Sequence, residues 1–220
     1  MEQKIFRDCT RTFLYKAFGL KLVRTQTVLT DWVNTTAEIL PHEQTILQLY
    51  KQSLTDSVFY WNEQELFGNF IGPLFSLVNF TEPYQYGFFA QRTITANVGN
   101  YELWGKPDGM IASGYEEPET PFFAFQEYKR ESDPNGEAAG QCLAAMLVGQ
   151  TLNENTDIPI YGCYAIGREW YFMTLIGKEY AISNNYSATT DDISTILQIL
   201  KSLKQIVIDI SSKLLAANQL

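Results

Sequence analysis

The sequence contains few of the residues from which many common catalytic and structural sites are built. Of its 220 residues only one is histidine and three are cysteine. His42 falls at the start of an expected surface helix, which argues against Ser-His-Asp chemistry and against a zinc site. Cys9, Cys142 and Cys163 form no CxxC pair and indicate no disulfide framework, so we interpret them as buried thiols in a reducing compartment.

Long apolar runs are also missing. No run approaches the ~18 residues that a transmembrane helix needs. The first residues are charged and lack the apolar segment of a signal peptide. Phosphate-binding loops of the GxxxxGK[ST] and GxGxxG types are absent as well. We therefore expect a cytoplasmic protein with no membrane-spanning segment.

Positive charge is scarce relative to negative charge. The formal net charge is −9 and the sequence pI is about 4.7, which argues against a protein that binds nucleic acid mainly through bulk charge. A local basic groove or an acidic metal site stays compatible with this balance. Hydrophobic residues make up 45% and charged residues 19% of the chain, as is typical of globular proteins.

The first part of the chain, residues 1–60, reads as a helical extension, and the next twenty residues as one further helix. Residues 61–80 carry an apolar stripe at helical spacing, with a kink expected at Gly72-Pro73. The segments expected to be helical within the extension are 4–18, 28–35 and 41–58.

The middle of the chain changes to the alternation and β-branched content of strands. Gly99-Asn100 is expected to be a hairpin turn. The expected strands are 88–98, 101–113, 121–131, 158–167, 168–177 and 178–183, with a helix at 136–153 and another at about 190–215. This order predicts an α/β (α+β) fold in which helices flank a mixed sheet.

The last helix carries apolar residues that step by three and four, as in the seam of a coiled coil. We interpret this seam as packing against the rest of the chain, with a homodimer through the same helix as the alternative. The residues of the seam are Ile193, Ile196, Leu200, Leu203, Val207, Ile210 and Leu214.

The chemistry of the chain is expected on a β-hairpin made by residues 106–113 and 122–131. Antiparallel pairing of these strands places Asp108 opposite Glu127, where facing Cβ atoms lie ~4.5–5.5 Å apart. Lys129 follows Glu127 by two positions and projects from the same face. The apolar run PFFAF before Glu127 marks a buried strand, where ionisable groups are costly without a purpose. The alternative is an exposed Glu127–Lys129 ion pair with Asp108 as a turn residue.

Two carboxylates and an ammonium group are suitable for phosphodiester hydrolysis. Carboxylate oxygens and water are the ligands that Mg²⁺ prefers. A Mg²⁺ ion held by Asp108 and Glu127 neutralises phosphate charge and lowers the pKa of a bound water. Lys129 can orient that water or stabilise charge in the transition state.

The motif Lys106-Pro107-Asp108-Gly109, followed by Gln126-Glu127-Tyr128-Lys129, resembles the PD…(D/E)xK motif of the PD-(D/E)XK nuclease superfamily. The resemblance implies a restriction-endonuclease-like αβββαβ core within residues 61–220 and cleavage of DNA with Mg²⁺, for which Mn²⁺ can substitute. It makes Asp108 and Glu127 metal ligands, with the Tyr128 carbonyl as a further ligand, and Lys129 the residue that positions water.

The resemblance extends to the helices on either side of the motif. NEQELFGNFIGPL is similar to the opening helix of nuclease domains in type I restriction motor subunits, which makes Glu63 the residue that completes the site. Gln141 matches a glutamine that several members carry on the helix after the motif, although Ala145 departs from the QxxxY continuation. The stretches WNEQEL, QEYK, GQCLAAM and PIYGCYAIGREW also resemble a narrower bacterial family, which implies no substrate.

Two other functions fit the same sequence. The acidic balance and the C-terminal seam favour a non-catalytic interaction module on the nuclease fold, in which the carboxylates no longer bind metal. A metal-dependent hydrolase of small phosphoesters is the third candidate. Metal binding separates the module from the two enzymes, and short substrates compared with DNA separate the enzymes.

Overall fold

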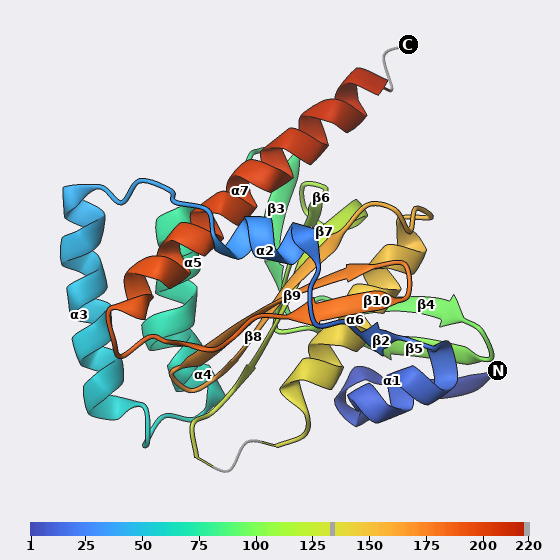
Figure 1. Ribbon diagram of the computed structural model, residues 1–220, viewed down its shortest axis with the longest axis horizontal. Coiled ribbons are helices and arrows are strands. Elements are labelled where there is room, and N and C mark those ends of the chain that lie inside the picture. The colour runs from blue at the N-terminus through green and yellow to red at the C-terminus, as the bar shows by residue number, and fades with distance from the viewer. Residues whose placement is uncertain (133–134, 218–220) are drawn as a thin grey trace.

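The computed structural model describes residues 1–132 and 135–217, and a mixed β-sheet lies at its centre (Figure 1). Neighbouring strands of this sheet are antiparallel, except that β7 is parallel to β8 and β2 is parallel to β10. In the described residues the strand order is β2 (Lys21–Leu22), β10 (Glu179–Ile182), β9 (Glu169–Ile176), β8 (Ile160–Ile166), β7 (Glu119–Lys129), β6 (Gly109–Ser113) and β3 (Tyr86–Ala90), with β11 (Tyr186–Ser187) beside β9.

One face of the sheet is covered by α6 (Ala138–Leu152), the helix that connects β7 to β8. Two parallel neighbouring strands need such a crossover, because the chain must return to the same end of the sheet. Six of the fifteen residues of α6 are alanine or glycine, which lets the helix approach the sheet closely, and every residue from Ala138 to Gln150 is buried. The expected helix at 136–153 is confirmed.

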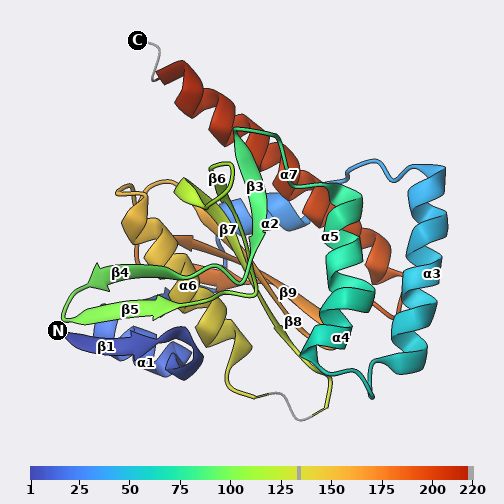
Figure 2. The ribbon, with the colours of Figure 1, turned by 180° about the vertical axis from the view of Figure 1, so that it is seen from behind.

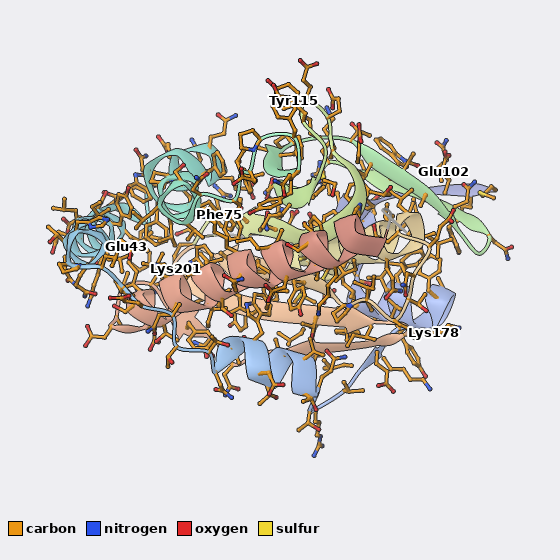
Figure 3. All side chains as sticks on the ribbon, turned by 90° about the horizontal axis from the view of Figure 1, so that it is seen from above. Glu43, Phe75, Glu102, Tyr115, Lys178 and Lys201 are labelled. Atoms are coloured by element: carbon orange, nitrogen blue, oxygen red, sulfur yellow. The ribbon has the colours of Figure 1, made fainter. Side chains whose placement is uncertain are left out.

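The opposite face is covered by several helices, which Figures 1 and 2 show gathered at one end of the molecule and along its length. They share a buried core with Phe123, Tyr128 and Trp170 of the sheet. Glu43 and Lys201 form an ion pair where two of these helices meet, as Figure 3 shows. The helices are α2 (Thr27–Val33), α3 (Pro41–Ser57), α4 (Glu63–Leu66), α5 (Gly72–Val78) and α7 (Asp192–Ala217).

A π-helical segment, η2 (Phe67–Ile71), joins α4 to α5 at the place where a kink is expected. Pro73 lacks the N–H that a regular helix would use, and its ring clashes with the preceding turn. Just before Pro73 the helical turn contains one extra residue. The N–H of Gly72 therefore donates to the carbonyl of Phe67, five residues earlier, as in a π-helix. The apolar side of the expected helix is buried as predicted, including Leu66, Phe70 and Leu74.

A small second sheet lies beside the face that α6 covers, and it corrects part of the sequence analysis. Its described strand order is β1 (Glu2–Ile5), β5 (Tyr101–Gly105) and β4 (Ile94–Val98). The hairpin turn at Gly99-Asn100 is confirmed, since Val98 pairs with Tyr101. The single helix expected at 4–18 is wrong: β1 is followed by the 3₁₀ helix η1 (Phe6–Asp8) and by α1 (Arg11–Phe18).

The expected strands at 88–98 and 101–113 each break into two. Residues 91–93 separate β3 from β4, and residues 106–108 separate β5 from β6. Each break transfers the chain from one sheet to the other. The break before β6 contains Pro107, which has no N–H for a sheet ladder. The extension at 1–60 is therefore helical only in part, because β1 joins the small sheet and β2 joins the central sheet.

The apolar seam of α7 packs inside the molecule over most of its length. Ile193, Ile196, Leu200, Leu203 and Val207 are buried, whereas Ile210 is half-buried. The side chain of Leu214 lies outside the described residues. Among the described helices none combines the length and the apolar content that crossing a membrane requires.

Candidate functional site

The β6–β7 hairpin has the register that the sequence predicts at its functional end. Gly109 pairs with Gln126, and Met110 pairs with Phe125. Asp108 directly precedes β6 and therefore reaches the level of Glu127. Further along, Ile111 pairs with Ala124 but Ala112 pairs with Phe122, so Phe123 is the extra residue of a β-bulge. The bulge changes the pairing only beyond the charged end of the hairpin.

Both carboxylate oxygens of Asp108 accept hydrogen bonds. The backbone N–H of Tyr128 donates to Oδ2 at 2.7 Å, which ties Asp108 across the hairpin to β7. The side chain of Gln91 donates from Nε2 to Oδ1 at 2.6 Å. Gln91 follows β3 and has a φ of 55°, a backbone conformation that is uncommon outside glycine and often found at functional sites. Asp108 is thus oriented from two different segments of the chain.

Lys129 connects the remaining two acidic residues. Its Nζ lies 2.7 Å from Oε1 of Glu127 and 3.9 Å from Oε1 of Glu63. Glu127 and Lys129 are 7% and 8% exposed, so this ion pair is shielded from water, whereas Glu63 is exposed at the start of α4. The exposed ion pair that the sequence left open as an alternative is therefore wrong.

Helix α4 begins at Glu63 because the preceding residue caps it. The side-chain oxygen of Asn62 accepts from the N–H of Glu65, and the Glu65 carboxylate accepts from the N–H of Asn62. This capping box satisfies two N–H groups that a helix start leaves unpaired. It uses Glu65 for the helix and leaves Glu63 to face Lys129.

The site carries more negative charge than its own cation balances. Asp108, Glu127 and Glu63 contribute three carboxylates against the single ammonium of Lys129, a net charge of −2 when all four are ionised. Burial, together with the nearby charge of Asp108, raises the pKa of Glu127 from 4.5 to about 8. Burial also raises the pKa of Asp108, against the opposing hydrogen bond from Tyr128.

Lys129 stays charged in spite of its burial. Burial by itself would lower the pKa of this ammonium, but the attraction of Glu127 outweighs it, with help from Glu63 and Asp108, so that the pKa is raised. The cluster therefore consists of a firmly protonated lysine and carboxyl groups that are short of positive charge.

A cavity of about 440 Å³ opens in front of Asp108. It provides space for a ligand between the start of α4 and the end of β3. Glu127 and Lys129 lie behind this opening, on β7. The residues that line the cavity are Glu63, Gln64, Phe67, Ala90, Gln91, Asp108 and Tyr128.

The carboxylate oxygens of Asp108 and Glu127 are the kind of ligand that a hard divalent cation prefers. Two acidic side chains from neighbouring strands present oxygen ligands, and their raised pKa values indicate that a further cation would stabilise their ionised form. Over residues 1–132 and 135–217, no three His, Cys, Asp or Glu side chains form a ready metal-binding group. Lys129 now contacts the Glu127 oxygen that a metal would share.

Gln141 lies on α6, which covers the face of the central sheet opposite to the one that α4 covers. Its side chain is directed toward Gly136. Gln141 is 5% exposed, and its Nε2 makes no hydrogen bond within the described part of the chain. It is not among the residues that line the cavity at Asp108. Of the predicted site residues, the structure joins Glu127 and Glu63 to Lys129 by ion pairs. Asp108 is tied to the strand that carries Glu127 and Lys129 by the backbone N–H of Tyr128.

Gln91 is the site residue that sequence reasoning missed. A glutamine after a strand has no motif of its own, and the residue belongs to a stretch that the sequence predicts as continuous strand. The dipeptide Gln91-Arg92 between two apolar runs is the one local signal of the break.

Comparisons with known proteins give no family for this chain. No protein-family model matches it, and no curated protein resembles it in sequence. The function of the site is therefore inferred from its own geometry and charge.

Proposed function

We propose that the protein is a Mg²⁺-dependent nuclease that hydrolyses phosphodiester bonds in DNA. The observation that carries the proposal is the cluster at the end of the β6–β7 hairpin, where Asp108 lines a cavity and is held against the strand that carries the buried Glu127–Lys129 ion pair. Burying ion-paired groups is costly and gives little stability by itself, so a cluster with excess negative charge favours a functional role.

Each residue has a part in this proposal. Asp108 and Glu127 would hold the metal, with the Tyr128 carbonyl as a further ligand, and the ion would supply a water of lowered pKa and neutralise phosphate charge. Lys129 orients the attacking water and donates to the charge that develops on the phosphate. Glu63 lines the cavity within 3.9 Å of the Lys129 ammonium and completes the acidic set, as a ligand through water or as a general base.

The order of elements supports the proposed nuclease core. The chain runs from the α4–α5 helix through β3, β6 and β7 to α6 and then β8, with β8 parallel to β7. With β4 and β5 inserted between β3 and β6 as part of the small sheet, this order is compatible with the αβββαβ core that the resemblance implies. Gln141 lies on the helix that the resemblance indicates, but its contacts with Gly136 favour a role in packing the start of α6.

Cleavage of nucleic acid with and without Mg²⁺ or Mn²⁺ tests the proposal directly. We expect the wild-type protein to cut DNA with either ion and to be inactive in chelator. Lys129→Ala is expected to abolish cleavage while the far-ultraviolet circular dichroism spectrum stays unchanged. Absence of cleavage on single-stranded DNA, duplex DNA and RNA alike would overturn the proposal.

The second candidate is a non-catalytic interaction module. The self-contained pairing of the cluster favours it, because Lys129 already contacts Glu127 and Gln91 already contacts Asp108. Calorimetric titration with Mn²⁺ separates the two functions. The nuclease requires binding that Asp108→Ala abolishes, whereas the module requires none. A homodimer through α7 belongs to this candidate and is tested by sedimentation.

A further inference from the structure

A second cavity, of about 520 Å³, lies on the other side of Phe67 from the carboxylate cavity. Its size falls within the range of about 300–1,000 Å³ that small-ligand sites occupy. The π-helical segment η2 and helix α5 form its wall, together with the loop after α5 and strand β3. The lining residues are Phe67, Gly68, Gly72, Pro73, Phe75, Ser76, Asn79, Phe80, Thr81 and Phe88. We refer to it as the aromatic cavity.

Four phenylalanine rings contribute to this wall and support one another, and of these Phe67 and Phe88 are half-buried while Phe75 and Phe80 are buried. The ring centroid of Phe75 lies 5.3 Å from that of Phe88 and 5.5 Å from that of Phe80. Phe67 stacks on Tyr128 with a centroid distance of 5.9 Å, and the backbone N–H of Tyr128 in turn donates to Asp108. The aromatic cavity is therefore connected to the proposed metal site through one ring and one strand.

Polar groups stand at the mouth of the aromatic cavity. Ser76, Asn79 and Thr81 are exposed there, and their side chains make no hydrogen bond with the described residues. An apolar wall of mutually tilted rings with a few polar groups at its edge suits a ring system that carries donors and acceptors on its rim. Nucleobases have this chemistry, and they stack on aromatic side chains when they are not paired.

The charge of the chain limits how such a ligand can be held. With a net charge of −9 the protein has little general attraction for the phosphate backbone, on which charge-driven binding depends. Recognition of a nucleic acid then needs contacts with the bases. From this, and on the basis of the proposed nuclease function, we propose that the aromatic cavity receives one unstacked nucleobase, so that the substrate is single-stranded or locally unpaired.

Gly68 provides a way to close this cavity without disturbing the fold. A Cβ atom on Gly68 would meet no described atom within 4 Å, and its backbone is not in the left-handed region. Gly68→Leu therefore fills the aromatic cavity, whereas Gly68→Ala adds only one methyl group and serves as the matched control. Neither change touches Asp108, Glu127 or Lys129.

Binding is measured in chelator, so that no strand is cut, by fluorescence anisotropy. The probes are a short single-stranded DNA, the same strand made of abasic nucleotides, and the matching duplex. We expect the wild-type protein to bind the base-containing strand about tenfold more tightly than either other probe, as ~1.4 kcal/mol of stacking gives. Gly68→Leu should remove this tenfold preference and leave abasic binding unchanged, and Gly68→Ala should stay within about twofold of wild type.

The outcomes separate this proposal from the nuclease function. Equal binding of the base-containing and abasic strands, or a Gly68→Leu variant that binds like wild type, would overturn the base site while metal-dependent cleavage stands. A preference that Gly68→Leu abolishes, in a protein that cuts nothing, would support the base site and overturn the nuclease. If none of the probes binds, the base site is wrong.

Discussion

The two helical walls on either side of β7 are packed in opposite ways. On one side, α6 is buried without interruption from Ala138 to Gln150, and a Cβ on Gly149 would overlap the ring of Phe125. On the other side, the α4–α5 segment contains a π-helical turn, the open position Gly68 and a cavity on each flank of Phe67. One wall therefore packs tightly against β7, whereas the other contains two cavities.

The largest expected effect comes from the charged cluster around Asp108, which lies beside the α4–α5 segment. Asp108→Asn keeps the size of the side chain but removes the charge that the proposed metal site needs. If the protein is the nuclease that we propose, cleavage should fall about 1000-fold, equivalent to ~4 kcal/mol in activation free energy. Stability should not fall, because a buried repulsion is removed. Initial cleavage rates and thermal unfolding measure the two effects. Asp56→Asn, the same change on the exposed face of α3, is the control.

The next effect is the change of the free energy of unfolding with pH, and it also concerns the cluster beside the α4–α5 segment. The folded-state pKa of Glu127 is raised from 4.5 to about 8, so its stabilising contribution is complete below pH 4.5 and is lost as the pH rises through 8. Asp108 acts in the same direction. We expect the metal-free protein to lose on the order of 3 kcal/mol between pH 5 and 8.

Urea unfolding at several pH values measures this loss. Glu127→Gln should flatten the curve over that window, and added Mn²⁺ should restore stability to the wild-type protein at pH 8. A wild-type curve with the same slope as that of Glu127→Gln would show that Glu127 titrates normally.

One substitution made in both walls tests the comparison most directly. Gly149→Leu forces a side chain into the ring of Phe125, and overpacking of this kind costs about 2 kcal/mol. Gly68→Leu should leave stability almost unchanged, because it projects into open space. The midpoints of thermal unfolding of Gly149→Leu and Gly68→Leu, each compared with wild type, measure this difference in stability. Equal losses in the two variants would mean that the walls are packed alike.

The smallest expected effect is a gain in stability. Gly68→Ala replaces the poorest ordinary helix former by the best one at a position without contacts, so we expect a stabilisation of about 0.5–1 kcal/mol. The counterpart on α6, Gly140→Ala, should destabilise the protein, because its Cβ would press on the backbone at Thr10. Opposite signs in denaturant unfolding are the expected result.

The parts of this fold that follow local patterns could be predicted from the sequence. The α6 helix, the turn at Gly99-Asn100 and the register of Asp108 with Glu127 all depend on residues that are near one another in the chain or alternate along one strand. The same holds for the apolar stripe of residues 61–80, where the kink was expected although its π-helical form was not.

The parts that depend on distant partners could not be predicted. β1 has the sequence EQKI, which shows no apolar alternation, and it is a strand because it pairs with β5 about a hundred residues later. Gln91 reaches Asp108 only because the chain leaves the central sheet at residues 91–93. The predicted domain boundary near residue 60 stays a prediction.

The pairing of β2 with β10 has a consequence for synthesis of the chain. These strands lie side by side in the finished sheet, and Gln26 donates to the carbonyl of Glu179, 153 positions further on. At about 5–20 residues per second, a ribosome needs roughly 8–30 s to deliver the later strand after the earlier one. During that delay the nascent Lys21–Leu22 segment lacks its β10 partner, so this edge of the sheet closes only after Glu179–Ile182 has been synthesised.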